Sequence, residues 1–340
     1  MFANTMDTLP ANRSRGTPRI SCVVPAFNEA ANLDLLLSTL TRQLQALVPA
    51  WEILIVDDGS RDATPALMAR WTRMAGVRWL RLSRNFGKEA ALTAGIDRAD
   101  GDVVVLMDAD LQHPPEMIAP MLEAWRRGAD MVCAARRSRD DESWAKRIGT
   151  WLFYRLINRP GAVEIPVDAG DFRLMDRRVA DALRALPERN RFMKGLYAWV
   201  GFDTEVLPYT PLPRHAGKSR FSLRRLAALA FTGVTAFTNA PLRVWSAIGA
   251  CIALAAMGFG LWIIGAHFFS GHDVPGWATL VTGLMFSAGI QLLSVGMLGE
   301  YVGRIFDEVK QRPVYIIGEE HGRGLAALRR AAPVRQDLAA

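Results

Sequence analysis

Along the first part of the chain, two patterns of hydrophobic and polar positions take turns, one typical of strands and one typical of helices. Short apolar runs rich in β-branched residues are followed by longer segments in which leucine or alanine recurs at helical spacing. The predicted strands are Ile20–Val24, Glu52–Val56, Val77–Leu82, Val103–Met107 and Asp130–Ala135, and the predicted helices are Glu29–Leu47, Asp62–Met74, Lys88–Ala99 and Pro114–Arg127. This alternation predicts an α/β domain with a mostly parallel sheet and helices on both faces.

The pattern is weaker between Trp144 and Pro208. It predicts a helix at Trp144–Ile157, a strand at Asp171–Met175, helices at Arg177–Leu186 and Phe192–Val200, and a strand at Thr204–Leu207. A basic segment, Arg214–Arg220, follows. The next segment, Leu223–Phe237, is apolar except for two arginines, which is typical of a helix that lies in a membrane interface.

Two long apolar segments, Val244–Phe269 and Trp277–Leu298, contain no Asp, Glu, Lys or Arg. At about 1.5 Å per residue, each is long enough to cross a bilayer core of about 30 Å. A buried hairpin in a soluble core is the alternative, but such helices seldom run this long without a charge. The loop between the segments has no Lys or Arg, whereas basic residues flank the pair: Arg224, Arg225, Arg243, Arg304, Lys310 and Arg312. By the positive-inside rule we expect two membrane spans with both termini in the cytoplasm.

Small residues are spaced four apart within the second apolar segment, at Gly283 and Ser287, and directly after it, at Gly299 and Gly303. Such faces let helices approach closely, within the hairpin or between subunits of a homo-oligomer. The expected organisation is a disordered tail at 1–17, an α/β domain at 18–213, a basic segment with an interfacial helix at 214–242, two membrane helices at 243–303, and a tail at 304–340 with a short strand, Val314–Ile317.

The net charge of the chain indicates which kinds of partner it binds, and its cysteines indicate the redox state of its compartment. The formal net charge of +7 and the pI near 9.7 favour an acidic partner, which could be nucleic acid, a phosphorylated substrate or an anionic membrane. Cys22, Cys133 and Cys251 lie in apolar runs without a close partner in the sequence, so we expect reduced packing residues in a reducing compartment. The first eighteen residues lack the apolar stretch of a secretory signal.

Polar residues follow four predicted strands where each strand ends, namely Asn28–Glu29, Asp57–Asp58, Ser83–Asn85 and Asp108–Asp110. Ligands of parallel α/β sheets bind beyond the carboxyl ends of the strands, so this rim is the expected site. Asp108 and Asp110 directly follow a buried strand, and two carboxylates there suit a divalent cation that bridges them to a phosphate. A solvated turn capped by aspartate is the alternative.

The run Asp57–Asp58–Gly59–Ser60 allows two interpretations. One is a turn followed by a helix that Ser60 caps, and the other is a pair of acids that accept hydrogen bonds from a base or a ribose. No G-x-G-x-x-G follows the first strand, which argues against a dinucleotide enzyme. Gly217–Lys218–Ser219 lacks the first glycine of a P-loop, where Leu212 stands, which argues against an ATPase. The five histidines show no zinc spacing.

Five motifs in order make the chain resemble the family-2 glycosyltransferases of GT-A fold. They are Val24–Glu29, Asp57–Ser60, Asn85–Lys88, Asp108–Gln112 with Pro114–Pro115, and Gly170–Arg173. Within that family the chain is similar to the polyprenyl-phosphate branch, which contains dolichol-phosphate mannose synthases, bactoprenol glucosyltransferases and undecaprenyl-phosphate formamido-arabinose transferases. The resemblance spans about residues 18–317 and includes the apolar hairpin, and the run Gly170–Asp176 favours the bactoprenol glucosyltransferases.

The resemblance implies a role for individual residues. Those expected to hold the nucleotide of the donor are Pro25, Phe27, Glu29, Asp57 and Asp58. Those expected to hold Mg²⁺ or Mn²⁺ on the diphosphate are Asp108, Asp110 and Gln112, of which the last adds an oxygen without adding charge. Lys88 and Lys218 are assigned to substrate binding, and catalysis is assigned to Asp110, Asp171 and Arg173.

The chemistry can also be argued from the reactants. A sugar nucleotide departs as a nucleoside diphosphate, so a metal ion would stabilise the charge that grows on the leaving oxygen. A lipid phosphate is largely a dianion at neutral pH, so it needs no strong base but needs cations that bring it into line. The candidate cations, each of which could instead be a solvated residue or a headgroup anchor, are Arg136, Arg137, Arg173, Arg214, Lys218 and Arg220. Asp171 would orient the acceptor or the sugar, or would be a structural turn acid.

The leading hypothesis is a metal-dependent, inverting transferase of the bacterial inner membrane. It would move one sugar from a nucleotide sugar, with UDP-glucose preferred, onto undecaprenyl phosphate at the cytoplasmic face, and it would have no nucleic-acid partner. Transfer of formamido-arabinose or mannose is the alternative within the branch. A processive polysaccharide synthase is disfavoured because no Q-x-x-R-W stretch and no further spans occur. A non-catalytic membrane scaffold is disfavoured by the intact Asp108, Asp110 and Gln112.

Overall fold

The structure, a computed structural model, describes residues 16–136, 169–189, 191–210, 240–270 and 276–325. The chain divides into two compact units, one made of Met1–Phe221 with Pro313–Ala340 and the other of Ser222–Arg312. Residues after 312, which the sequence pattern sets apart as a tail, therefore group with the α/β unit. Several predictions fall outside the described residues: the helix at Trp144–Ile157, Arg137, the basic segment with Lys218, and the interfacial helix.

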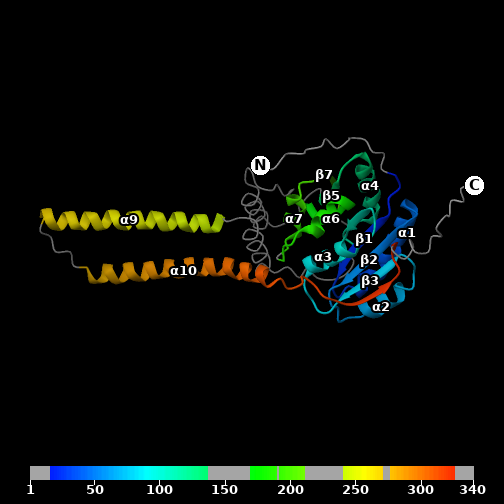
Figure 1. Cartoon of the computed structure of the whole chain (residues 1–340), viewed down its shortest axis with the longest axis horizontal. Helices are drawn as coiled ribbons and strands as arrows, with labels where there is room; N and C mark the ends of the chain where they lie inside the picture. Colours follow the sequence, from blue (N-terminus) through cyan, green and yellow to red (C-terminus); the bar gives the residue numbers. More distant parts are fainter. Residues whose placement is uncertain (1–15, 137–168, 190, 211–239, 271–275, 326–340) are drawn as a thin grey trace, which may run out of the picture. The chain divides into compact units, whose positions relative to one another are not determined.

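The α/β unit is built on one sheet whose described strands lie in the order β7-β5-β6-β4-β1-β2-β3-β8 (Figure 1). The strands are β1 (Ile20–Ala26), β2 (Trp51–Asp57), β3 (Val77–Leu82), β4 (Val103–Leu106), β5 (Met131–Arg136), β6 (Ala169–Asp176), β7 (Thr204–Tyr209) and β8 (Ile317–Gly322). Neighbours β1, β2, β3 and β4 pair in parallel, as do β5 and β7. Strand β6 is antiparallel to both β4 and β5, and β8 is antiparallel to β3. The predicted mostly parallel α/β sheet is confirmed.

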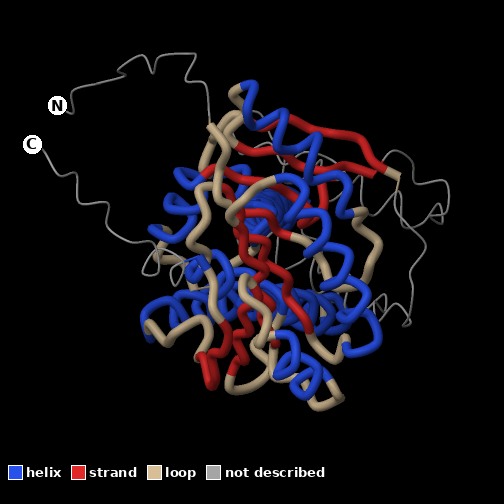
Figure 2. The backbone as a smooth tube through the Cα atoms, turned by 90° about the vertical axis from the view of Figure 1, so that its right-hand side faces the viewer, coloured by secondary structure: helices blue, strands red, loops and turns tan. Residues whose placement is uncertain are grey.

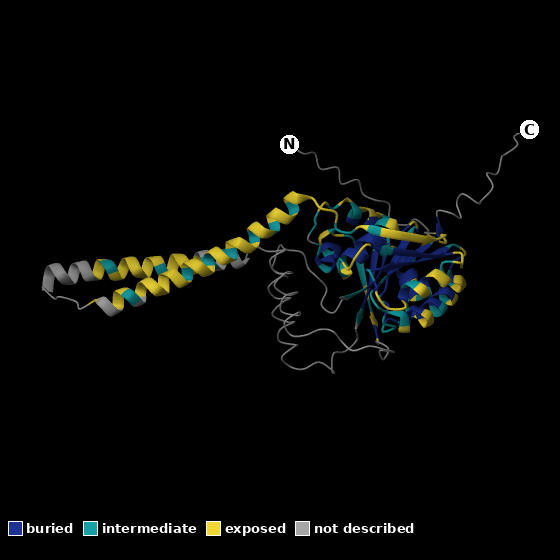
Figure 3. Cartoon of the chain, turned by 90° about the horizontal axis from the view of Figure 1, so that it is seen from below, coloured by how far each residue is buried: buried dark blue, intermediate teal, exposed yellow. Residues whose placement is uncertain are grey.

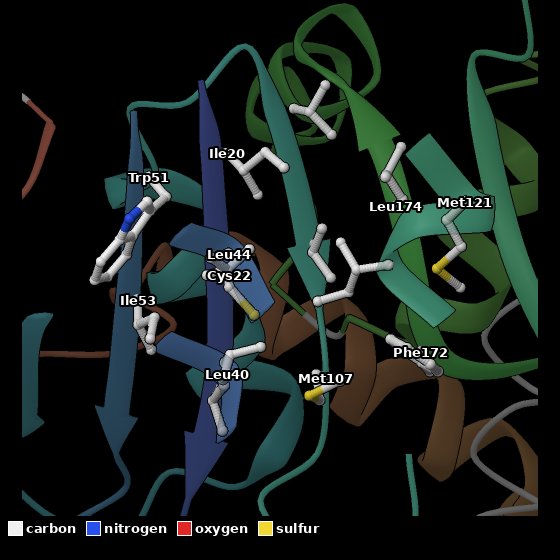
Figure 4. Close-up of a cluster of buried hydrophobic side chains, with 14 of the residues drawn as sticks. Ile20, Cys22, Leu40, Leu44, Trp51, Ile53, Met107, Met121, Phe172 and Leu174 are labelled. Carbon is white, nitrogen blue, oxygen red and sulfur yellow. The ribbon is translucent and has the colours of Figure 1, made fainter. Parts of the chain in front are cut away.

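Helices cover both faces of this sheet, as Figure 2 shows. They are α1 (Ala30–Leu47), α2 (Thr64–Trp71), α3 (Lys88–Arg98), the 3₁₀ turn η1 (Pro115–Met117), α4 (Ile118–Arg127), α6 (Arg177–Ala185) and α7 (Met193–Trp199). The leucines of α1 recur at helical spacing, and Leu40 and Leu44 pack against Cys22 and Ile53 of the strands (Figure 4). On the opposite face α3 approaches so closely that a Cβ added at Gly95 would collide with a β1 side chain.

Two local predictions are wrong. Ser60 does not cap a helix, because α2 begins only at Thr64, and the Ser60 hydroxyl instead accepts a hydrogen bond from the Asn28 amide at 2.9 Å. The strand expected at Val314–Ile317 begins at Ile317. Most residues of β8 are polar, so a search for apolar runs does not find this strand. Charged edge strands of this kind are common because charge discourages pairing with other chains.

The second unit contains α9 (Ala240–Ser270) and α10 (Trp277–Lys310), whose described surfaces are largely exposed (Figure 3). Among the described residues one helix, Thr279–Lys310, is long and apolar enough to cross a membrane. The described apolar part of α9, Ala247–Trp262, is shorter. One of the two predicted spans is therefore supported by length and composition, and the two-span topology is not confirmed.

Candidate active site

The topology brings the start of β6 to the rim where the parallel strands end. Because β6 runs antiparallel to β4, Arg173 pairs with Leu106 and the preceding Asp171 lies beside the end of β4. Asp108 follows that end by two residues. A carboxylate from the start of one strand and a carboxylate from the end of its neighbour thus share one site.

Lys88, the first residue of α3, joins these two carboxylates. Its Nζ lies 2.6 Å from Asp108 Oδ1 and 2.6 Å from Asp171 Oδ2, and its side chain is 43% exposed. Burial lowers the pKa of Lys88, but the charges of Asp171 and Asp108 outweigh burial and raise the pKa above its ordinary value. Burial likewise opposes ionisation of Asp171, yet Lys88 holds the pKa of that carboxyl well below its usual range. The ammonium group of Lys88 therefore lies between the carboxylates of Asp108 and Asp171.

Asp58 fixes the loop that leads into Lys88. Its Oδ1 accepts a hydrogen bond from Phe86 N at 2.7 Å and its Oδ2 accepts one from Gly87 N at 2.9 Å. Gly87 has a φ of 99°, a backbone conformation that glycine adopts without strain. Burial raises the pKa of Asp58, and the two amides partly offset this. Asp58 thus orients α3, and its expected contact with a nucleotide stays a prediction.

An open cavity of about 520 Å³ lies at the ends of β1, β2 and β3. Its lining residues are Phe27, Gly59, Ser60, Arg61, Arg81, Leu82, Ser83, Arg84, Asn85, Gly318 and Glu319. Of the residues expected to hold the nucleotide, Phe27 lines this cavity. Asp57 lies beside it, fully buried, with Oδ1 accepting from Ser60 N at 2.7 Å and Oδ2 4.0 Å from Arg81 Nε. Pro25, Glu29 and Asp58 are not among its lining residues.

The turn after β4 carries the expected metal ligands. Leu111 has a φ of 60°, and Asp110 Oδ1 accepts a hydrogen bond from Gln112 N at 3.1 Å, so the turn is tight. Asp108, Asp110 and Gln112 are all partly exposed. In the described part of the chain no group of three or more His, Cys, Asp or Glu side chains forms a metal cluster. The donor set fits a hard cation that takes one or two carboxylates here and its remaining oxygens from a diphosphate and water.

His113 supports this turn, and the sequence analysis missed it. Its Nδ1 accepts a hydrogen bond from Asp108 N at 3.2 Å. Its ring stacks on Phe172 at 4.8 Å and meets Tyr209 edge-on at 5.9 Å. Burial lowers the pKa of His113, so the neutral ring that this hydrogen bond requires is favoured. A histidine between the expected ligand Gln112 and two prolines was the available signal.

Arg173 follows Asp171 by two residues on β6 and is only 4% exposed. Its Nη2 donates to the Gly170 carbonyl at 2.7 Å, and its guanidinium carbon lies 3.6 Å from the centre of the Tyr197 ring. These contacts hold the start of β6, and therefore Asp171, in place. The expected contact of Arg173 with an acceptor phosphate stays a prediction.

Glu89, next to Lys88, is a second residue that sequence reasoning missed. Its Oε2 accepts a hydrogen bond from Met193 N at 3.0 Å and so ties α3 to α7. Burial raises the pKa of Glu89 to about 7, and the nearby charge of Asp171 adds to this shift.

The raised pKa of Glu89 should make the folded state sensitive to pH. The folded protein keeps a proton on Glu89 that the unfolded chain releases above the ordinary pKa of 4.5. The free energy of unfolding therefore falls as pH rises from 4.5 through about 7. A Glu89→Gln variant keeps an oxygen acceptor for Met193 and should therefore gain thermal stability relative to wild type between about pH 5 and about pH 8. Melting temperatures at both pH values check this. The matched control is Glu123→Gln, which changes an exposed acid on α4, and an offset for Glu89→Gln that does not vary with pH would contradict the expectation.

Known glycosyltransferases are similar to this chain in sequence. The model of the family described as Glycosyl transferase family 2 matches residues 21–184. A prophage-derived bactoprenol glucosyl transferase of Shigella flexneri is 44% identical over 305 residues, which cover 89% of this chain and 98% of that protein. A glycosyltransferase of Synechocystis sp. is 42% identical over 307 residues, which cover 90% of this chain and 96% of that protein.

Among solved structures, a mannosyltransferase from Pyrobaculum calidifontis in complex with GDP-Man and Mn²⁺ is 17% identical and covers 86% of this chain and 87% of that chain. Its TM-score is 0.43. The two protein relatives, in contrast, match far beyond residues 21–184, so the likeness includes most of the sequence that follows the family domain.

Proposed function

Because the chain belongs to the glycosyl transferase family 2 and is a glycosyltransferase, we propose that it moves a single glucose from UDP-glucose onto polyprenyl phosphate, with undecaprenyl phosphate as the preferred acceptor. The observation that carries this proposal is the 44% identity to a bactoprenol glucosyl transferase over 98% of that protein's length. A likeness of this extent includes the residues around Lys88, Asp108 and Asp171 as well as the apolar helices.

The donor side of the proposal uses the cavity at the ends of β1, β2 and β3. Phe27 and Arg81 line a space open enough for a nucleotide, and Asp57 lies next to it. Asp108, Asp110 and Gln112 would hold Mg²⁺ or Mn²⁺. When bound, that ion would supply positive charge to the departing diphosphate.

The acceptor side of the proposal uses Lys88, whose ammonium group lies between the carboxylates of Asp108 and Asp171. An oxygen of the lipid phosphate forms a bond to the anomeric carbon while the bond from that carbon to the diphosphate breaks, so the configuration inverts and a nucleoside diphosphate leaves. The phosphate dianion carries no proton that must be removed. Lys88, whose ammonium group is partly exposed, would meet the acceptor phosphate, and Asp171 would hold that ammonium group in position. Arg136 and the basic residues Arg214, Lys218 and Arg220 remain further candidates for this contact.

Transfer of formamido-arabinose or of mannose is the second candidate within the same branch, and a panel of donors separates the three sugars. Purified full-length protein with undecaprenyl phosphate would be offered UDP-glucose, GDP-mannose and UDP-formamido-arabinose in turn. We expect the glycolipid to form with UDP-glucose, with one UDP released per sugar transferred. A glycolipid formed only with another donor would refute the assignment of glucose, and no glycolipid with any donor would refute the assignment of the acceptor.

The membrane part of the proposal places two spans at α9 and α10, with the catalytic unit and both termini in the cytoplasm of a bacterial inner membrane. The lack of Lys and Arg at 270–276 and the basic flanks support this orientation. The small-residue faces of α10 support a homo-oligomer.

A cysteine at position 271 tests the topology. In a variant that lacks the three native cysteines, Gly271→Cys should react with a membrane-impermeant thiol reagent added to intact cells. The matched control, Arg312→Cys, follows α10 and should react only after lysis. The reverse pattern would refute the orientation, and labelling of both positions from outside would refute the two-span topology.

A further inference from the structure

The residues that follow α10 form the edge strand of the catalytic sheet. Strand β8 pairs antiparallel with β3, from Gly322 opposite Arg78 to Ile317 opposite Leu82. Two further backbone hydrogen bonds extend the pairing, from Ser83 N to Ile316 O and from Gly76 N to Arg323 O, both at 2.9 Å. Strand β8 is thus the neighbour of β3, the strand whose end lines the cavity.

Buried charges fix this C-terminal segment, residues 313–325, in place. Glu52 of β2 is fully buried, and its Oε2 lies 3.1 Å from Arg78 Nη1 and accepts a hydrogen bond from Leu325 N at 3.1 Å. Arg78 Nη2 pairs with Glu320 Oε1 at 2.9 Å. A further bond runs from the Tyr315 hydroxyl to Asp97 at 2.8 Å. Because an unpaired buried charge is costly, these contacts hold the segment against β3.

The same segment reaches the cavity through Gly318 and Glu319, both of which line it. The pairing of β8 with β3 shifts by one residue between Arg81 and Leu82, and this irregularity lies at the cavity. Glu319 Oε1 lies 3.0 Å from Arg81 Nη1, and Arg81 Nε lies 4.0 Å from Asp57 Oδ2. Arg81 also donates to the Ser60 carbonyl at 3.5 Å. The guanidinium is therefore held between a carboxylate of β2 and a carboxylate of the C-terminal segment.

We propose that the C-terminal segment is a wall of the donor's nucleotide pocket, and that Glu319 is a positioning residue that holds Arg81 beside Asp57 so that its remaining N–H groups face a nucleoside diphosphate. This inference rests on the proposed function, since it assigns the cavity to the nucleotide. Without Glu319 the long Arg81 side chain can take other rotamers, and ordering it again on binding would cost affinity.

The test uses purified full-length protein in detergent micelles, titrated with UDP in a calorimeter. Glu319→Gln should raise the Kd for UDP about fivefold, or about 1 kcal/mol. Arg81→Gln should weaken UDP binding at least as much, and adding Glu319→Gln to it should cause no further loss, because the two residues act as one unit. In the transferase assay the KM for the donor should rise for Glu319→Gln while kcat changes less than about twofold, as expected when binding common to the ground state and the transition state is lost.

Glu320→Gln is the matched control. Glu320 is the adjacent acid on the same strand, but it pairs with Arg78 and Arg98 and is not among the residues that line the cavity. Its substitution should leave the Kd for UDP unchanged, because the backbone pairing with β3 and the hydrogen bonds of Leu325 and Tyr315 still hold the segment. Equal UDP affinity of Glu319→Gln and wild type would overturn the inference, as would an equal loss in Glu320→Gln, which would trace the effect to a loosened strand. Wild-type protein that binds no UDP would overturn the proposed donor as well, so the two failures are distinguishable.

Discussion

Replacing Lys88 with methionine should lower kcat for glucosyl transfer by about a hundredfold or more, the range seen when one preorganised electrostatic contact is removed from an active site. In the structure the ammonium group bridges Asp108 and Asp171 at 2.6 Å from each. Its loss would leave two carboxylates facing each other and would remove the cation that we assign to the acceptor phosphate. Rates of transfer from UDP-glucose to undecaprenyl phosphate, with melting temperatures to confirm folding, measure the effect.

Lys194→Met is the matched control for this substitution. Lys194 acts on Asp171 electrostatically, but no ion pair between them is observed, so its loss should cost less than about tenfold. Lys88→Arg keeps the charge with a different geometry and should retain part of the rate. A Lys88→Met variant with wild-type kcat would remove Lys88 from the mechanism.

Asp110→Asn should lower transfer by about a thousandfold and should abolish tight binding of Mn²⁺ in the presence of UDP. The expected cation shell on this chain has only two carboxylates, so neutralising one halves its negative charge. Electron paramagnetic resonance of Mn²⁺ titrations reports binding independently of turnover. Asp34→Asn, which changes an exposed acid on α1, is the control and should alter neither quantity. Labelling of lipid by Asp110→Asn at the wild-type rate, together with unchanged Mn²⁺ affinity, would refute the metal assignment.

The position of the site at the strand ends could be predicted because polar residues follow apolar runs there. Asp57, Asp58 and Asp108 all lie at that rim. The direction of β6 could not be predicted, since alternating apolar residues look the same in a parallel and an antiparallel strand. Only the antiparallel pairing with β4 places Asp171 beside Asp108, so the ion pairs of Lys88 were not foreseeable.

The sequence also did not predict which polar residues have structural roles. Asp58 has the sequence context of a ligand-binding acid, yet its carboxylate binds two backbone amides. Strand β8 is mostly polar, so periodicity placed the tail strand too early. Arg78 and Arg81 in the otherwise apolar β3 were the available signal, because buried or partly buried arginines need acidic partners from another segment. Their partners, Glu319 and Glu320, lie far along the chain, and only the fold brings them together.

In the proposed reaction one glucose moves from a nucleotide to a lipid phosphate. The most direct test supplies full-length protein in vesicles containing undecaprenyl phosphate with UDP-glucose radiolabelled in the sugar. We expect label to enter the lipid extract in a mild-acid-labile form, with one glucose per lipid phosphate and an equal amount of UDP released. Label recovered only as free glucose, or in a polymer of many sugars per lipid, would rule out the transfer of a single glucose to the lipid phosphate.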